Sequence, residues 1–275
     1  MALLRNDMKY RLENKTVVLT GASSGIGKEI ATVLVTKYSC RVYGIARRES
    51  LLLELRDSLG DNFIPCAFDA TDRGKWQDLA NQLKSEDVTV DTLINCAGVL
   101  PKFSSVENST SEQVLKAMSI NFNAQIYATE ALLPSIKKST QGAVISFSSS
   151  SALCPFVGVS AYCASKSASR AYFECFAREN KKLYVASVMN GFAKTDIMRE
   201  QSIGKKEMRL ISKVSASPQK TVARILRKIK KRKSRIIVGA DAHLMNFAYK
   251  LFPNLAPKII TKILKGSGLE IFNEI

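Results

Sequence analysis

The stretch TGASSGIG at residues 20–27 follows a short apolar run, Thr16–Thr20, and opens a helical pattern from about Gly25 to Tyr38. Glycines at such a turn let backbone amides approach a pyrophosphate, which then lies at the positive end of the helix. A glycine triplet alone also serves ordinary tight turns. Its position after the opening strand of a βαβ unit favours a dinucleotide site. The residues expected to form that site are Gly21, Ser23, Ser24, Gly25, Ile26 and Gly27.

Outward from this turn, strand and helix patterns alternate along the chain, which is typical of a parallel sheet. Further strands are expected at residues 41–46, 63–68, 92–95, 143–147, 183–188 and 235–238, and further helices from about residue 50 and at 75–85, 111–138 and 162–180. The pair Ser217-Pro218 starts one more helix, with the apolar stripe Val222, Ile225, Leu226 and Ile229.

No repeat or flexible linker divides residues 1–275, so we predict one α/β domain. The expected architecture is a doubly wound Rossmann fold, with a seven-stranded parallel sheet and helices on both faces. An irregular segment at about 192–216 is interpreted as a substrate lid, and residues from about 241 to 275 as a helical tail.

Composition and charge narrow the class of protein. A content of 46% hydrophobic and 24% charged residues is ordinary for a globular chain. No secretory signal or membrane span is visible, and six cysteines without paired or metal-ligand spacing indicate reduced thiols, so a cytoplasmic location is expected. The net charge of +17 is concentrated at residues 194–235, which hold fifteen Lys or Arg against three Asp or Glu. That patch is either a solvated helix face or a surface for an anionic partner.

The end of the second expected strand favours one dinucleotide over the other. Sites that prefer NAD place a carboxylate here for the ribose 2′-hydroxyl. This chain has Ala46-Arg47-Arg48 instead, and a guanidinium suits a 2′-phosphate through charge-assisted contacts. We therefore predict NADP(H) as the cofactor, bound by Arg47 and Arg48.

A tyrosine and a lysine lie four residues apart in Tyr162-Cys163-Ala164-Ser165-Lys166. Side chains at this spacing share one helix face, so the ammonium of Lys166 can approach the phenol of Tyr162. A nearby cation is expected to lower the tyrosine pKa toward the operating pH of a proton donor. Such pairs are common by chance, but Ser149 stands just past the fifth expected strand, where strand ends form the ligand crevice.

Together these motifs resemble the short-chain dehydrogenase/reductase family in its common single-domain branch. The residues that carry the resemblance are TGASSGIG at 20–27, Asp69, NCAG at 95–98, Asn121, Ser149 and YCASK at 162–166. The overall texture is nearest to hydroxysteroid and retinol dehydrogenase-like members, and general carbonyl reductases are not separated from them.

The resemblance implies roles for individual residues. Tyr162 would donate or remove the proton at the substrate oxygen, and Lys166 would bind the nicotinamide ribose. Ser149 would hold the carbonyl oxygen, and Asn121 would seat a water that relays protons. Contacts on the adenosine side would come from Asp69, Ala70, Asn95, Ala97 and Gly98, and contacts near the nicotinamide from Gly191 and Thr195. Hydride passes directly from the nicotinamide, so no metal is expected.

Two positions depart from the family pattern. Cys96 stands where the family has a second asparagine, and Asn190 stands where it has a proline before Gly191. The first change puts the local hydrogen bonding of its turn in doubt. The second should loosen the turn after the sixth strand without abolishing the site.

Apolar residues in the expected lid indicate a lipophilic ketone, aldehyde or secondary alcohol as substrate, of steroid, retinoid or lipid type. They are Phe192, Ile197, Met198, Ile203 and Met208, with Leu100, Phe156 and Val157 from neighbouring loops. About half of them would serve only to pack against the sheet.

The tail, His243–Lys265, combines apolar residues with four lysines. Core packing or a dimer contact is one interpretation, and peripheral docking on an anionic membrane is the sharper one. By the resemblance, a homodimer or homotetramer would form through the helices at 111–138 and 162–180.

Two other functions compete with a reductase of lipophilic carbonyls. One is a 3-oxoacyl reductase whose basic patch receives an acidic acyl carrier. The other is a protein that senses NADP without turnover, which the intact Ser149, Tyr162 and Lys166 set disfavours. Nucleic-acid binding is the weakest interpretation, because the patch lacks interleaved aromatic residues.

Overall fold

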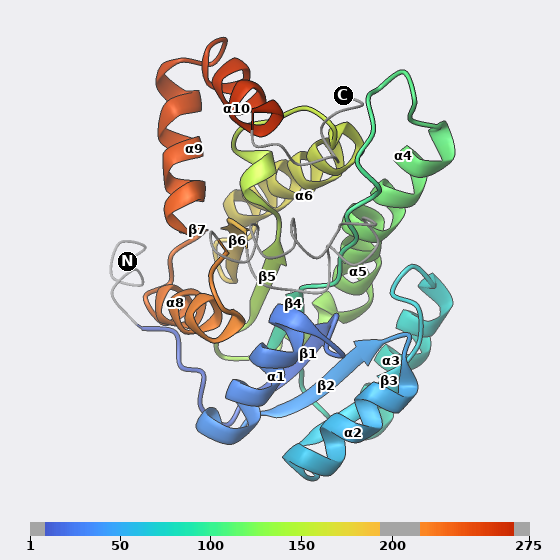
Figure 1. Ribbon diagram of the computed structural model, residues 1–275. Coiled ribbons are helices and arrows are strands. Elements are labelled where there is room, and N and C mark those ends of the chain that lie inside the picture. The colour runs from blue at the N-terminus through green and yellow to red at the C-terminus, as the bar shows by residue number, and fades with distance from the viewer. Residues whose placement is uncertain (1–8, 193–214, 267–275) are drawn as a thin grey trace.

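The structure is a computed structural model that describes residues 9–192 and 215–266. Seven parallel strands form one sheet in the order β3-β2-β1-β4-β5-β6-β7 (Figure 1). The strands are β1 (Thr16–Thr20), β2 (Arg41–Ala46), β3 (Phe63–Ala67), β4 (Thr92–Asn95), β5 (Ala143–Phe147), β6 (Tyr184–Asn190) and β7 (Arg235–Val238). Strand order reverses between β1 and β4, where the carboxyl ends of the strands leave a crevice for ligands. The predicted α/β fold with a seven-stranded parallel sheet is confirmed.

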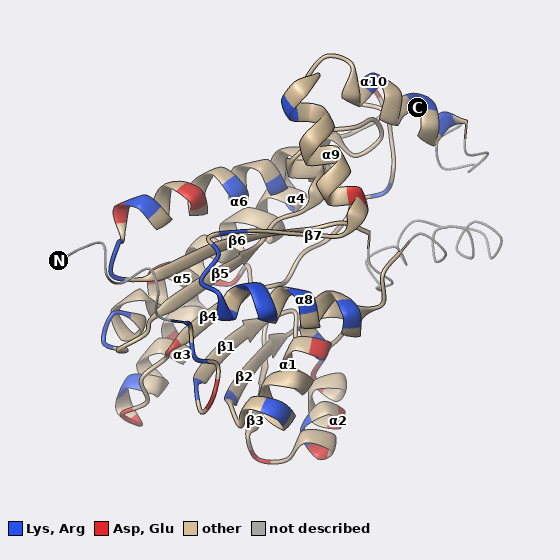
Figure 2. Cartoon of the chain, turned by 90° about the vertical axis from the view of Figure 1, so that its left-hand side faces the viewer, with Lys and Arg blue, Asp and Glu red and all other residues tan. Residues whose placement is uncertain are grey.

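Helices cover both faces of the sheet. They are α1 (Gly25–Tyr38), α2 (Glu49–Leu59), α3 (Arg73–Ser85), α4 (Ser111–Met118), α5 (Ala124–Ile136), α6 (Ser160–Glu179), α8 (Pro218–Lys230), α9 (Ala240–Leu251) and α10 (Ala256–Lys265). Buried side chains of α1, α2 and α8 pack on one face, and those of α3, α5 and α6 on the other. Figure 2 shows α8 and α1 on one side of the sheet and α6 on the other.

The start of α8 is as the sequence predicts. The Ser217 hydroxyl accepts a hydrogen bond from the backbone N–H of Lys220, and Pro218 occupies the first turn. The expected stripe, Val222, Ile225, Leu226 and Ile229, is buried in the core.

The helix expected over residues 111–138 is not a single α-helix. It consists of α4, a π-helical turn η2 (Ser119–Asn123) and α5. The wider turn of η2 rotates the residues that follow it, so α4 and α5 no longer share one continuous face. Smaller differences occur elsewhere: α6 begins at Ser160 rather than Tyr162, and β6 runs from Tyr184 to Asn190 rather than over 183–188.

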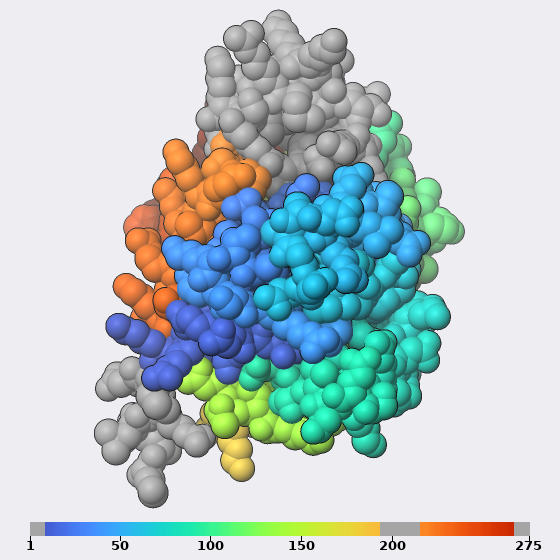
Figure 3. Space-filling view, turned by 90° about the horizontal axis from the view of Figure 1, so that it is seen from below, coloured from blue at the N-terminus to red at the C-terminus, as the bar shows by residue number. Residues whose placement is uncertain are grey.

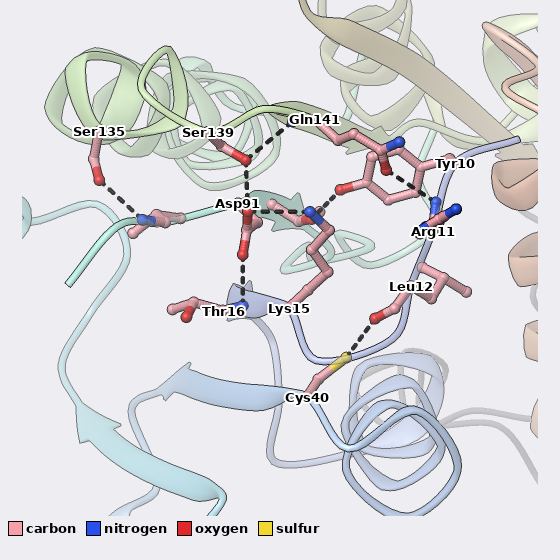
Figure 4. Close-up of polar contacts among 12 residues, drawn as sticks. Tyr10, Arg11, Leu12, Lys15, Thr16, Cys40, Asp91, Ser135, Ser139 and Gln141 are labelled. Carbon is pink, nitrogen blue, oxygen red and sulfur yellow. Dashed lines mark hydrogen bonds and ion pairs between the residues drawn. The ribbon is translucent and has the colours of Figure 1, made fainter. Parts of the chain in front are cut away.

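At the amino ends of the strands, Asp91 links three parts of the chain (Figure 4). Its carboxylate accepts hydrogen bonds from the backbone N–H of Thr16, the ammonium of Lys15 and the hydroxyl of Ser139. The chain before β1 also lies between α8 and the loop after α5, as Figure 3 shows from below. The N–H of Tyr10 bonds the carbonyl of Lys230, which holds this segment against α8. Hydrogen bonds therefore hold the segments together at this end of the sheet, and the ligand crevice lies at the opposite end.

Candidate active site

A cleft of about 450 Å³ opens at the carboxyl ends of the strands. Its walls come from the segments that follow β1 to β6 and from the first turns of α6. Residues predicted for the site that line the cleft are Gly21, Ser23, Ser24, Gly25, Ile26, Gly27, Arg47, Arg48, Asp69, Ala70, Ala97, Gly98, Ser149, Tyr162, Lys166 and Gly191. The fold thus brings together residues that are up to 170 positions apart in the sequence.

The glycine turn after β1 is built for close backbone approach. Gly21 has a positive φ of 72°, and a Cβ there would lie 3.0 Å from the backbone of Ala97. A Cβ on Gly27 would lie 2.1 Å from the carbonyl oxygen of Gly21. The Thr20 hydroxyl accepts from the N–H groups of Cys96 and Ala97 at 2.9 and 3.0 Å, which joins this turn to the end of β4.

The two arginines after β2 have different surroundings. Arg48 Nη2 donates to the hydroxyls of Ser23 and Ser24 at 3.2 and 3.0 Å, so its guanidinium lies over the glycine turn. Arg47 Nη1 is 3.9 Å from Asp69 Oδ2, and both of those side chains are largely exposed. Asp69 also accepts from the N–H and hydroxyl of Thr71. A cradle that a Cβ would fill, with a guanidinium beside it, fits a dinucleotide phosphate group.

At the other end of the cleft, α6 positions Tyr162 and Lys166 beside the segment after β5. The Tyr162 phenol lies close enough to the Ser149 side chain for Ser149 to lower the pKa of the phenol. Lys166 is buried, donates from Nζ to the carbonyl of Phe147 at 3.0 Å, and lies 5.8 Å from the centre of the Tyr162 ring. The Ser149 hydroxyl in turn accepts from the backbone N–H of Ser151. The predicted cluster of phenol, ammonium and hydroxyl is therefore assembled.

Burial dominates the protonation of this cluster. It raises the pKa of Tyr162 to about 12, and the nearby Ser149 side chain only partly offsets the increase. Burial also lowers the pKa of Lys166 to about 8. The expectation that Lys166 lowers the pKa of Tyr162 is not met in this structure, because loss of water around the phenol raises that pKa and Lys166 is not among the groups that shift it. The Lys166 Nζ is bonded to the Phe147 carbonyl instead.

Asn121 is held by its side chain rather than free to bind ligand. Its Oδ1 accepts from the N–H of Val99 at 2.8 Å, and its Nδ2 donates to the Val99 carbonyl and to the Ser165 hydroxyl. The π-helical turn η2 points this residue at the loop after β4. A Cβ on Gly98 would lie 2.9 Å from Asn121 Oδ1 and 3.0 Å from Lys166 Nζ, so these three residues are packed together.

Asn95 does not line the cleft. It is fully buried, its Nδ2 is 3.5 Å from the Gln125 carbonyl, and its Oδ1 has no partner among the described residues. The last residue of β4 points toward α5 rather than into the crevice, where the expected contact with adenosine would be. Sequence reasoning missed the buried network beside it, in which Ser146 bonds Gln125 Oε1 at 2.7 Å and the Ser169 hydroxyl at 2.9 Å.

Asp241, at the start of α9, is a second residue that the sequence did not single out. Its carboxylate accepts from the N–H of Phe192 at 2.7 Å. A Cβ on Gly191 would lie 2.1 Å from both carboxylate oxygens, so only glycine fits there without a shift. Asn190, Gly191 and Phe192 all line the cleft, so Asp241 fixes one of its walls.

The apolar end of the cleft is formed by Leu100, Phe103, Phe156, Val159 and Phe192. Val157, expected there, is not among the lining residues. Thr195 and the lid residues Ile197, Met198, Ile203 and Met208 lie outside the described residues. The described chain leaves at Phe192 and returns beside it, because the N–H of Ala216 bonds the Phe192 carbonyl at 3.1 Å.

A family model described as short chain dehydrogenase matches residues 15–206, which include the glycine turn and the whole phenol–ammonium–hydroxyl cluster. The chain belongs to the short-chain dehydrogenase family. Short-chain dehydrogenases are oxidoreductases that use a nicotinamide cofactor. The resemblance predicted from the motifs is thereby confirmed at the level of the family.

Other short-chain dehydrogenases and reductases resemble this one at moderate identity. A Saccharomyces cerevisiae benzil reductase ((S)-benzoin forming) is 33% identical over 161 residues, which are 56% of this chain and 61% of the relative. The chain therefore spans less than two thirds of that protein. A 3-ketodihydrosphingosine reductase of Bos taurus is 28% identical over 265 residues, covering 91% of this chain and 77% of the relative.

Solved structures have the same fold. The crystal structure of the short-chain dehydrogenase/reductase YIR035C from Saccharomyces cerevisiae has a TM-score of 0.73 at 26% identity and covers 85% of this chain and 99% of its own. A Burkholderia cenocepacia short-chain dehydrogenase in complex with NADP has a TM-score of 0.75 at 21% identity, covering 94% and 98%. At that lower identity the similarity establishes the fold alone.

Proposed function

We propose that this short-chain dehydrogenase is an NADP(H)-dependent oxidoreductase that moves a hydride between nicotinamide and a lipophilic ketone, aldehyde or secondary alcohol. The observation that carries the proposal is the position of Tyr162, Ser149 and Lys166 at one end of a single cleft, with Arg48 over the glycine turn at the other. Tyr162 is the general acid and base in this proposal.

The choice of NADP(H) rests on the end of β2. Arg48 already donates to Ser23 and Ser24, and a 2′-phosphate is a stronger acceptor than either hydroxyl. Arg47 is the second cation at this position, and no carboxylate follows β2 directly. When bound, the nicotinamide cofactor supplies or accepts the hydride. Gly21, Gly25 and Gly27 would hold its pyrophosphate, with Asp69, Ala70, Ala97 and Gly98 on the adenosine side.

In the direction of reduction, Tyr162 gives its proton to the substrate oxygen. A pKa of about 12 keeps the phenol protonated at neutral pH, so the proton to be given is present. Ser149, close to the phenol, orients the same oxygen, and Lys166 supplies positive charge behind the tyrosine ring. Asn121 would hold the loop after β4 in place beside Lys166, because its side chain is bonded to Val99 and both residues pack around Gly98.

The substrate class rests on the apolar end of the cleft. Leu100, Phe103, Phe156 and Val159 surround the face on which Tyr162 lies, and a lipophilic group would bury them. The relatives named as a benzil reductase and a 3-ketodihydrosphingosine reductase support a reductase of such ketones. We also propose a homo-oligomer, because the face of α4 and α6 exposes Leu115 and Tyr172.

A substrate panel tests the proposal. Lipophilic ketones, aldehydes and secondary alcohols are offered with each dinucleotide, and the absorbance of the reduced nicotinamide is followed. Consumption of NADPH with lipophilic ketones, and little consumption of NADH, is the expected result. Turnover confined to 3-oxoacyl groups on an acyl carrier would favour the carrier reductase instead. Tight NADPH binding without turnover of any substrate would contradict catalysis.

A further inference from the structure

Helices α9 and α10 form a hairpin with two apolar faces. The inner face is packed: Met245 and Ala256 are buried with Cys154, and Phe156 and Ile260 lie against them. The outer face is open, although its residues are as apolar as those inside. Its large exposed side chains are Leu244 (67%), Phe247 (62%), Leu251 (55%), Phe252 (56%), Leu255 (51%), Ile259 (49%) and Ile263 (64%). A group of exposed apolar side chains of this size marks a surface that contacts another protein, a membrane or a ligand.

The hairpin also carries a one-sided charge. Lys250, Lys258, Lys262 and Lys265 are exposed on it, and α10 contains no acidic residue. Along α10, Lys258 and Lys262 stand one turn apart and directly precede Ile259 and Ile263, so ammonium groups border the apolar stripe. In α9 the acidic residue is Asp241, whose carboxylate is engaged with the N–H of Phe192.

We propose that the outer face of the α9–α10 hairpin docks on the surface of an anionic lipid bilayer. Leu244, Phe247 and Ile263 would enter the boundary between headgroups and acyl chains, and the lysines would contact lipid phosphates. Among the described residues no helix is long and apolar enough to span a bilayer. In the proposed contact the two helices would lie in the interface plane. Figure 2 shows the hairpin projecting from the rest of the molecule, as such contact requires.

Charge favours a bilayer over a second copy of the chain as the occupant. A symmetric contact between two hairpins would place the same surface against itself. Lys258 and Lys262 would then face other lysines with no free carboxylate on α10 to pair with them. An anionic lipid surface pairs with those ammonium groups and covers the apolar side chains at the same time.

The position of the hairpin gives this docking a consequence for the cleft. Phe156 belongs both to the packed cluster under the hairpin and to the apolar lining of the cleft. Asp241 of α9 holds Phe192, another lining residue. Docking of the outer face would therefore act on the apolar end of the cleft through Phe156 and Phe192, which the hairpin contacts from its other side. That consequence rests on the proposed function, whereas the docking itself does not.

Vesicle sedimentation with the full chain tests the proposal without any measurement of turnover. Wild-type protein should sediment with phosphatidylcholine vesicles that contain phosphatidylglycerol, and much less with phosphatidylcholine alone. The triple variant Leu244→Ser, Phe247→Ser, Ile263→Ser should bind at least about tenfold more weakly. The matched control is Leu53→Ser on α2, also an exposed leucine, which should bind like the wild type. Thermal melting and light scattering of every variant confirm the fold and the molecular mass.

Four results would overturn the proposal. The wild-type chain could fail to sediment with phosphatidylglycerol vesicles, or the triple variant could sediment as well as the wild type. The wild type could also fail to bind vesicles while the triple variant has half its molecular mass. The face would then be a contact between copies of the chain. If the protein binds vesicles only after residues 267–275 are removed, the outer face is a docking site for the end of the chain itself. Loss of vesicle binding with intact turnover, or the reverse, separates this proposal from the proposed function.

Discussion

Lys166 is the cation in the cleft whose surroundings differ most from water. Its side chain is 3% exposed, with Nζ bonded to the Phe147 carbonyl, so its charge is stabilised by few dipoles. The same burial keeps Tyr162 protonated, and the two residues therefore share one desolvated corner of the site. At the scale of the residue, the chemistry of the cleft depends on the protonation states of Tyr162 and Lys166.

The stability of the protein should report the buried charge of Lys166. Its pKa falls from 10.5 to about 8 on folding, so between these values the unfolded chain holds a proton that the folded chain has lost. Below about pH 8 the buried charge of Lys166 therefore lowers the free energy of unfolding, and this cost is removed as pH rises and the folded chain loses the proton. The free energy of unfolding of the wild type minus that of Lys166→Met should increase by about 2 kcal/mol between about pH 8 and pH 10. A difference that stays flat in denaturant titrations would contradict the prediction.

Arg48 should decide the preference between the two dinucleotides. Removing its guanidinium with Arg48→Ala should weaken NADPH binding by about 10–100-fold, the value of a charge-assisted hydrogen bond, and leave NADH binding nearly unchanged. Fluorescence titration of the reduced cofactors measures both constants. Arg56→Ala, on the same side of the sheet but paired with Asp61, is the matched control. An equal loss for both cofactors would mean that Arg48 does not contact the 2′-phosphate.

Single residues differ in how far the sequence can place them. The glycine turn and the Tyr162–Lys166 pair were predictable because their geometry is local to one turn or one helix. Asn95 was misplaced because the direction of the last side chain in β4 depends on the packing of α5, which is remote in sequence. The pKa of Tyr162 was misjudged for a related reason: the degree of burial is a property of the tertiary structure.

At the scale of the element, the cleft is an assembly of segment ends, and α9 shows how one end can hold another. The turn before α9 contains Gly239 with φ of 114°, which lets Asp241 reach back to the chain after β6. Nothing in the local sequence around Asp241 indicates this contact, because its partner Phe192 is 49 positions away. A π-helical turn such as η2 is equally hard to predict from sequence, since apolar spacing does not distinguish it from an α-helix.

The contact between Gly191 and Asp241 should be measurable as a coupling. Gly191→Ala should lower the free energy of unfolding by about 1–3 kcal/mol, because its Cβ would overlap the Asp241 carboxylate. In an Asp241→Ala background the same change should cost much less. Denaturant unfolding of the four proteins of this double-mutant cycle gives the coupling energy. Equal costs in both backgrounds would show that Asp241 does not occupy that space.

At the scale of the whole molecule, the amino ends of the strands are tied together at Asp91, and the carboxyl ends carry the cleft. The fold was predictable at this scale, because alternating strand and helix patterns with short connections leave few arrangements of a parallel sheet. The surfaces were less so, since exposure depends on which neighbours cover each helix. Leu115 on α4 is 66% exposed and Tyr172 on α6 is 41% exposed, although both are large and apolar.

Oligomerisation should depend on that face. Light scattering of the wild type should give the mass of a dimer or tetramer, and Leu115→Glu should give a smaller species, because a carboxylate in an apolar contact is left without a partner. Leu53→Glu on α2 serves as the matched control and should keep the wild-type mass. A wild type that is already monomeric would refute the prediction.

In the proposed function, Tyr162 moves the proton at the substrate oxygen. Tyr162→Phe removes that hydroxyl and keeps the ring, so the most direct measurement compares its turnover number and NADPH affinity with those of the wild type. We expect a turnover number lower by at least about 100-fold, with NADPH affinity within a few-fold of the wild type. A Tyr162→Phe protein that reduces the same ketone at the wild-type rate would contradict the account.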